Sequence, residues 1–126
     1  MKYKNNLSED AICFEFVEFL ENIKKYKEID FIYLHVPNEI SSNKNPAFGH
    51  KLKKLGKLPG APDYIFMWDN DFGCIEFKTE KGKLSDNQKN FQTHCKLLNV
   101  KYEIARSCDQ GIDILKEWGL LKGLMI

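Results

Sequence analysis

Two carboxylates and one amine in the middle of the chain have the spacing of a small reactive centre. Asp63 begins an apolar run that ends at Trp68, and a second run ends with Glu76 and Lys78. The residues between the two runs, Asp69-Asn70-Asp71, are typical of a tight turn. In an antiparallel hairpin the start of the first strand lies beside the end of the second, so we expect Asp63 close to Glu76. Lys78 follows Glu76 by two residues and shares its face of the strand.

Neighbouring carboxylates repel each other unless a cation lies between them, and oxygen ligands of this kind suit Mg²⁺. The lysine beside them could orient an attacking water or neutralise a phosphate. The simpler interpretation is a surface hairpin with an ordinary cross-strand ion pair, because a Glu-x-Lys spacing is common. The Gly60-Ala61-Pro62-Asp63 sequence that precedes the first run favours the reactive centre.

A helix over about residues 9 to 25 brings a third carboxylate to the same region. Ser8 can cap this helix, and acids in its first turn suit the helix dipole. Glu9 lies on the apolar stripe of the helix, whereas the later glutamates point away from it. Its simpler role is electrostatic stabilisation of the helix start. The stripe consists of Ile12, Cys13, Phe16, Phe19, Leu20 and Ile23.

The other elements follow in a simple order. We expect a buried strand over residues 29–36, then a long polar and basic connection that holds one helical turn or two. A second helix starts at Ser85, where Gln88 completes a capping-box pattern. A half-exposed strand over residues 100–105 and a last helix over about residues 110–118, capped by Ser107 or Asp109, end the fold. Four residues in and just before this second helix should face the core: Leu84, Phe91, Cys95 and Leu98.

Composition is that of a soluble, single-domain protein. The chain has 126 residues, 43% hydrophobic and 29% charged, which is enough for one core. It has neither an apolar run of membrane-spanning length nor a signal-peptide pattern at its start, so we expect a cytoplasmic protein. Its four scattered cysteines argue against a structural zinc site and for reduced thiols.

Positive charge gathers in one stretch. The net charge is only +1, but residues 44–57 hold five lysines and no acid. This segregation is compatible with a side that faces phosphates, and equally with a solvated lysine-rich loop.

Taken together, the motifs from Ser8 to about Ala105 resemble a stand-alone VRR-NUC domain of the PD-(D/E)XK nuclease superfamily. One departure is Phe77, where many relatives carry an aliphatic residue; its side chain should point away from the site. The residues that carry the resemblance are Glu9, Pro37-Asn38, Lys54-Leu55-Gly56, Gly60-x-Pro62-Asp63, Glu76-x-Lys78 and Gly82-x-Leu84-Ser85-x-x-Gln88.

The resemblance implies an α/β (α+β) fold over residues 1–126, with a restriction-endonuclease-like core of α-β-β-β-α-β order. Its central mixed sheet would be flanked by helices. It also implies metal-dependent hydrolysis of DNA phosphodiester bonds that leaves a 5′-phosphate. Stand-alone members of the family are often phage-encoded, resemble Holliday-junction resolvases and act as homodimers. We therefore expect a DNA endonuclease selective for branched DNA.

The resemblance also implies roles for particular residues. Mg²⁺ or Mn²⁺ would be held by Asp63, Glu76 and the backbone carbonyl of Phe77, with Glu9 contributing to a second ion. Lys78 would orient or deprotonate the attacking water. Gln88 would contact the phosphate or support the lysine. DNA contacts are expected from Asn38, Lys51, Lys53, Lys54, Lys57, Lys81 and Lys83.

Two other functions remain open from the sequence. A non-catalytic DNA-binding module on the same fold would have no use for paired acids near a phosphate. A protein-interaction domain would rest on the apolar tail alone. That tail either folds back on its own core or contacts a second copy of the chain. Its apolar residues are Trp118, Leu120, Leu121, Leu124 and Met125.

Overall fold

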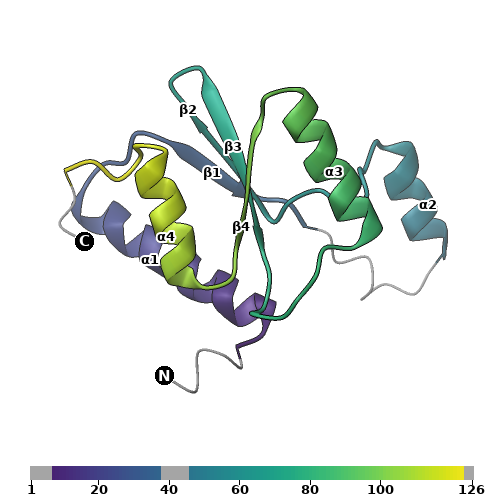
Figure 1. Cartoon of the computed structure of the whole chain (residues 1–126), viewed down its shortest axis with the longest axis horizontal. Helices are drawn as coiled ribbons and strands as arrows, with labels where there is room; N and C mark the ends of the chain where they lie inside the picture. Colours follow the sequence, from purple (N-terminus) through teal and green to yellow (C-terminus); the bar gives the residue numbers. More distant parts are fainter. Residues whose placement is uncertain (1–6, 38–45, 124–126) are drawn as a thin grey trace.

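The computed structural model describes residues 7–37 and 46–123, which form four helices and one four-stranded sheet (Figure 1). None of the helices in these two ranges is long and apolar enough to cross a membrane. In chain order the elements are α1 (Glu9–Tyr26), β1 (Ile32–His35), α2 (Pro46–Lys54), β2 (Tyr64–Trp68), β3 (Asp71–Phe77), α3 (Asp86–Leu97), β4 (Lys101–Ala105) and α4 (Cys108–Glu117).

The sheet is mixed, with the strand order β1-β2-β3-β4. The first three strands are antiparallel neighbours, and β4 runs parallel to β3 after the crossover through α3. Helices α1 and α4 pack together on one face, and α3 lies against β4 on the other side (Figure 1). The expected α+β fold with helices on both sides of a mixed sheet is confirmed.

Aromatic side chains fill the core between the sheet and helix α1. The ring of Phe16 is fully buried, and its centroid lies 4.9 Å from that of Phe77 and 6.0 Å from that of Tyr64. Gly111 of α4 has to lack a side chain here, because a Cβ atom would lie 2.8 Å from the Phe16 ring. The predicted apolar stripe of α1 therefore anchors the helix to the strands that carry the candidate site.

The β2–β3 hairpin has the register that the sequence predicts. Asp69 and Asn70 both adopt positive φ angles, 29° and 63°, as a two-residue hairpin turn requires. The turn is shorter than expected, since Asp71 already pairs with Trp68 in the ladder. Because Tyr64 pairs with Ile75, the residue that precedes β2 lies beside Glu76.

Three expectations need correction. Strand β1 has four residues, and its Ile32 side chain is 63% exposed rather than buried, because β1 is an edge strand. Helix α2 spans nine residues and is longer than the one or two turns expected. Leu98 is 67% exposed, because α3 ends at Leu97 and the next residue is its C-cap.

The C-terminal tail folds back on its own core as far as it is described. Trp118 stacks on Trp68 with 5.4 Å between ring centroids, and Leu121 is only 5% exposed. Leu120 packs against the same core. Leu124 and Met125 lie outside the described residues. For the described residues the structure therefore favours the alternative in which the tail folds back on its own core.

Candidate active site

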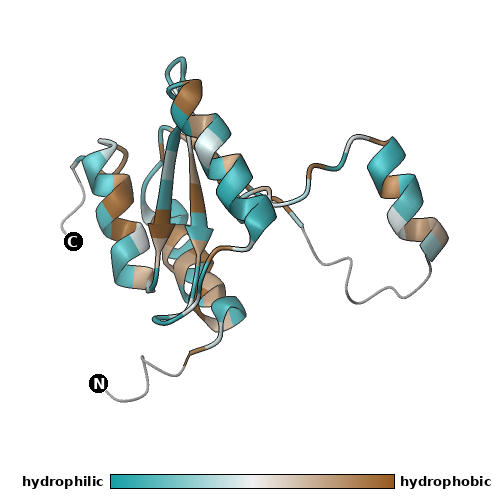
Figure 2. Ribbon diagram, turned by 45° about the vertical axis from the view of Figure 1, so that its right-hand side comes forward, coloured by the Kyte–Doolittle hydropathy of each residue, from teal (hydrophilic) through white to brown (hydrophobic). Residues whose placement is uncertain are grey.

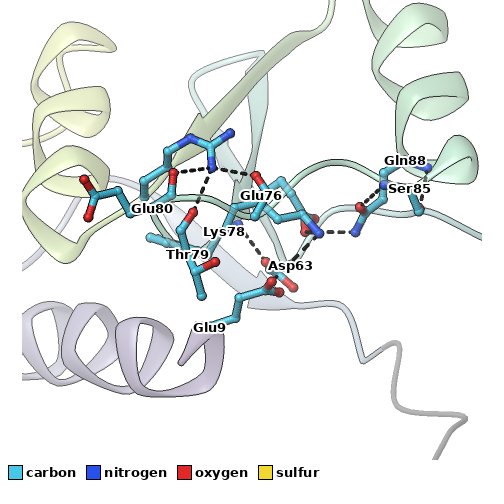
Figure 3. A network of polar contacts seen from close by, with 11 residues as sticks. Glu9, Asp63, Glu76, Lys78, Thr79, Glu80, Ser85 and Gln88 are labelled. Atoms are coloured by element: carbon cyan, nitrogen blue, oxygen red, sulfur yellow. Dashed lines mark hydrogen bonds and ion pairs between the residues drawn. The ribbon is translucent and has the colours of Figure 1, made fainter. Parts of the chain in front are cut away.

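Five of the residues predicted from the sequence come together at the base of the hairpin. Glu9 approaches from the start of α1, Asp63 and Glu76 come from the two sides of the hairpin, and Lys78 follows β3 (Figure 3). Gln88 reaches the same point from the first turn of α3. Three elements that are distant in the sequence thus meet at one cluster of charge.

The backbone of β3 fixes the side chain of Asp63. Oδ2 of Asp63 accepts a 2.7 Å hydrogen bond from the backbone N–H of Phe77. The carbonyl of Asp63 accepts another from Val36, 2.8 Å long, and lies 3.0 Å from Nδ1 of His35. These contacts hold the carboxylate against the main chain at Phe77, whose carbonyl is the expected further metal ligand.

Glu76 is an ionisable group that is almost fully buried. Its side chain is 2% exposed, and Oε2 accepts a 3.0 Å hydrogen bond from the amide of Gln88. Oε1 is buried and finds no hydrogen-bond partner among the described residues. A buried acceptor without a partner costs free energy, more so when it carries charge. This oxygen is therefore free to accept a cation.

Burial and mutual repulsion perturb both carboxyl groups. Desolvation, and then the neighbouring Asp63, raises the pKa of Glu76 to about 8. Desolvation raises the pKa of Asp63 as well, and the charge of Glu9 adds to the effect. Carboxyl groups perturbed in this way are characteristic of functional sites.

Lys78 places its amine between two acids without touching either closely. The residue is 7% exposed, and its Nζ lies 3.8 Å from Oε2 of Glu76 and 4.0 Å from a carboxylate oxygen of Glu9. Both distances exceed a hydrogen bond. The amine is held near the carboxylates but keeps donors for another group.

Gln88 serves the helix cap and the site at once. Its Oε1 accepts from the backbone N–H of Ser85 at 2.8 Å, which completes the predicted capping box, and its Nε2 donates to Glu76. The loop before Asp63 packs closely against the first turn of α3 at Gly60, which has a φ of +80°. A Cβ atom at this position would lie 2.3 Å from the Asn87 backbone. The geometry makes Gln88 a support of Glu76.

These residues fit a hard divalent cation. The described residues contain no group of three His, Cys, Asp or Glu side chains arranged to hold a metal. Two carboxylates and a main-chain carbonyl nevertheless form the all-oxygen set that Mg²⁺ and Mn²⁺ prefer. The unpartnered Oε1 of Glu76 is the specific observation in favour of this fit.

The described residues among the predicted DNA contacts lie in two segments, helix α2 with the residues after it and the loop before α3. Lys51, Lys53 and Lys54 are exposed on α2, which lies beyond α3 in both views (Figures 1 and 2). Lys53 and Lys57 line a hollow of about 410 Å³ that also reaches Gln88. Lys81 and Lys83 lie in the loop before α3, and Asn38 lies outside the described residues.

Sequence reasoning missed two residues that hold the site. His35, at the end of β1, borders the carbonyl of Asp63. Arg106 donates to the carbonyls of the loop that follows Lys78. His35 could have been noticed from its position just before Val36-Pro37, which indicates the end of a strand. For Arg106, the signal was that it is the only arginine in the chain.

Comparison with known proteins gives one match. The family model described as "VRR-NUC domain" matches residues 32–109. This range includes Asp63, Glu76, Lys78 and Gln88 but not Glu9. Neither the curated proteins nor the solved structures yield a match to the chain.

The raised pKa of Glu76 predicts how stability depends on pH without metal. The pKa of a glutamate in an unfolded chain is near 4.5, whereas Glu76 in the folded protein, with a pKa raised to about 8, holds its proton up to that pH. Between these values the folded state binds more protons, so stability falls as pH rises. Urea denaturation with EDTA present, from about pH 5 to about pH 8, should show this fall, and Glu76→Gln should weaken it. A stability difference between wild type and Glu76→Gln that is constant across this range would contradict the assignment.

Proposed function

Because the chain belongs to the VRR-NUC family, a nuclease domain of the restriction-endonuclease-like superfamily, we propose that it is a divalent-metal-dependent DNA endonuclease. The observation that carries the proposal is the buried Glu76 carboxylate, with one unpartnered oxygen, beside Asp63 and Lys78. A surface ion pair would not need such burial, since exposed pairs form without loss of hydration.

In this proposal Asp63 and Glu76 hold Mg²⁺ or Mn²⁺ together with the backbone carbonyl of Phe77. When bound, the ion would polarise the phosphate and favour ionisation of the attacking water. Glu9, whose side chain is 45% exposed at the rim, contributes to a second ion. The positive charge of the bound ion would also offset the repulsion that, together with desolvation, raises the pKa of both carboxyl groups.

The remaining residues orient the reacting groups. Lys78 holds a positive charge in a site from which water is largely excluded, where a charge acts more strongly than in solution. It orients the attacking water and stabilises the negative charge that develops on the phosphate. Gln88 keeps Glu76 in one orientation through its 3.0 Å hydrogen bond.

The lysine-rich side supports contact with a DNA backbone. Helix α2 and the residues after it present Lys51, Lys53, Lys54 and Lys57 without an acid between them. The hollow lined by Lys53 and Lys57 is continuous with Gln88, so a strand lying there would pass the reactive centre. Lysine contacts to phosphates carry little sequence information. We therefore propose a substrate chosen by shape, such as branched DNA.

A symmetric homodimer would suit such a substrate, because paired nicks in a four-way junction need two sites related by a two-fold axis. The described tail residues Trp118, Leu120 and Leu121 pack on their own core, whereas the open side of the sheet presents an apolar surface. Four apolar side chains on neighbouring strands β1, β2 and β3 are between 38% and 63% exposed there. They are Ile32, Leu34, Met67 and Phe72. We propose that a second copy of the chain covers this face.

Cleavage is the first test of the proposal. Purified protein should cut branched DNA with Mg²⁺ or Mn²⁺ and stop in EDTA. Asp63→Asn, Glu76→Gln and Lys78→Met, which preserve size, should each lower the single-turnover rate by about 10²-fold or more. Glu18→Gln, at an exposed position of α1, serves as the matched control. Cleavage in EDTA, or by the Asp63 variant, would refute a metal-dependent nuclease. Binding without cutting in any metal would favour a DNA-binding module.

Replacing two lysines tests the DNA-contacting side. Lys53→Gln with Lys57→Gln should weaken binding to all DNA sequences about equally. The slope of log affinity against log salt should become shallower by roughly 0.9 for each phosphate that the variant no longer neutralises. Fluorescence anisotropy in Ca²⁺ over a salt series measures both. Lys25→Gln with Lys122→Gln is the charge-matched control, because Lys25 lies in the last turn of α1 and Lys122 follows α4, and neither lines the hollow. Equal slopes for the two double variants would exclude Lys53 and Lys57, and thus the hollow that they line, from the interface.

Light scattering tests the dimer. The wild-type mass should be twice the 14.7 kDa of the chain. Ile32 and Met67 are cross-strand partners, so Ile32→Glu with Met67→Lys can pair within one chain while opposing a dry interface. This variant should be monomeric, whereas Phe14→Lys, on an exposed part of α1, should not change the mass. A wild-type protein that stays monomeric with a junction bound would rule out the dimer. A dimeric double variant would exclude this face.

A further inference from the structure

We propose that Arg106 is a positioning residue of the candidate site: it fixes the loop of residues 79–82 and through it the placement of Lys78 and Gln88. This inference rests on the proposed nuclease function. Arg106 follows β4, and it is the only arginine among the 19 lysine and arginine residues of the chain. It belongs neither to the carboxylate cluster nor to the lysine-rich side.

One guanidinium nitrogen of Arg106 lies within hydrogen-bond distance of three backbone carbonyls of the loop. The two N–H groups of Arg106 Nη1 donate to the carbonyls of Thr79 and Gly82, each at 2.7 Å, and the carbonyl of Glu80, at 3.2 Å, shares one of these hydrogens. The carbonyl of Thr79 also accepts the backbone N–H of Gly82 at 3.1 Å, which closes the loop into a turn. Figure 3 shows Thr79 and Glu80 beside Lys78, on the side away from Gln88. Carbonyls that would otherwise repel one another converge on a single cation.

The sheet anchors this guanidinium at a fixed place. The backbone N–H of Arg106 donates to Oε1 of Gln110 in α4 at 2.7 Å. The carbonyl of the preceding residue, Ala105, accepts the backbone N–H of Lys78 at 2.9 Å and so extends the β3–β4 ladder. Arg106 therefore holds the loop from the end of β4, the strand that borders β3.

The loop has direct consequences for Lys78. A Cβ atom at position 82 would lie 2.9 Å from the Thr79 hydroxyl and 3.5 Å from Cδ of Lys78. The backbone of Gly82 thus borders the stem of the lysine. If the carbonyls of Thr79 and Gly82 were released, the loop would move away from this stem and the amine would lose its fixed position.

The same loop leads into the cap of α3. Only two residues separate Gly82 from Ser85, whose N–H and hydroxyl form the capping box with Gln88. The amide of Gln88 then holds Glu76. One arginine therefore controls a group at each end of the loop, the amine of Lys78 before it and the amide of Gln88 after it.

Arginine suits this role better than lysine does. Its planar guanidinium stays charged and holds the two N–H groups of Nη1 in a fixed plane, whereas a lysine amine is a compact charge on a flexible stem. We expect Arg106→Lys to recover only part of the activity that Arg106→Ala removes. Lys96→Met, which removes a charge from an exposed position near the end of α3, is the control for net charge.

The first measurement is made without metal or DNA. Backbone amide exchange followed by NMR should show exchange at Gly82 faster by about tenfold or more in Arg106→Ala than in wild type, with the core amides of β3 unchanged. Unchanged exchange at Gly82 would overturn the claim that Arg106 holds the loop. This outcome does not depend on whether the protein cuts DNA.

The second measurement separates positioning from folding and binding. At a temperature where all variants are folded, Arg106→Ala should cut pre-bound DNA about tenfold to 10²-fold more slowly, with affinity in Ca²⁺ changed less than about twofold. Millimolar guanidinium should restore part of the rate in Arg106→Ala but not in Lys78→Met. A normal rate, or a fall in affinity that accounts for the whole defect, would overturn the inference. A wild-type protein that cuts no DNA would refute the proposed function. Amide exchange would still test whether Arg106 holds the loop of residues 79–82.

Discussion

The carboxylate of Glu76 imposes the constraint on which the rest of the site depends. It is buried beside the carboxylate of Asp63, and one of its oxygens lacks a partner among the described residues. Two such groups can be kept together by a shared proton, by a neighbouring amine or by a metal ion. Lys78 supplies the amine, but at 3.8 Å it offsets the repulsion only in part. Without a metal ion a proton on Glu76 relieves the remaining repulsion, as its pKa of about 8 indicates, and under the proposed function a metal ion would take the place of that proton.

The fold holds these unfavourable neighbours in place through separate supports. The hairpin register puts Asp63 beside β3, where the Phe77 N–H holds it. The first turn of α3 supplies Gln88, and the aromatic core around Phe16 fixes the helix that carries Glu9. Because each support belongs to a different element, the charged groups cannot relax apart without disturbing the packing. Preorganisation of this kind is what electrostatic catalysis requires.

The sequence predicts the parts of the site that depend on local pattern. Two apolar runs and the turn residues between them located the hairpin and thus the pairing of Asp63 with Glu76. Helical spacing and a capping box located α1, α3 and Gln88. These signals are short-range, because strand pairing across a tight turn and side-chain caps involve residues only a few positions apart.

What the sequence could not predict depends on packing between distant segments. Strand β1 has an apolar sequence but is exposed, because it lies at the edge of the sheet. The apolar tail residue Leu121 is buried against the core of its own chain, which no local pattern distinguishes from an exposed contact surface. Arg106 lies 24 residues from Gly82 in the sequence, and no motif connects them.

Calorimetric titration of the wild-type protein with Mg²⁺ or Mn²⁺ at neutral pH, in buffers of different ionisation enthalpy, tests the central claim most directly. Because the pKa of Glu76 is raised to about 8, an ion that binds there must displace its proton. We predict that metal binding at pH 7 releases about one proton per site from the wild-type protein. Glu76→Gln should release none. Binding heats that are the same in every buffer, or no binding at all, would contradict it.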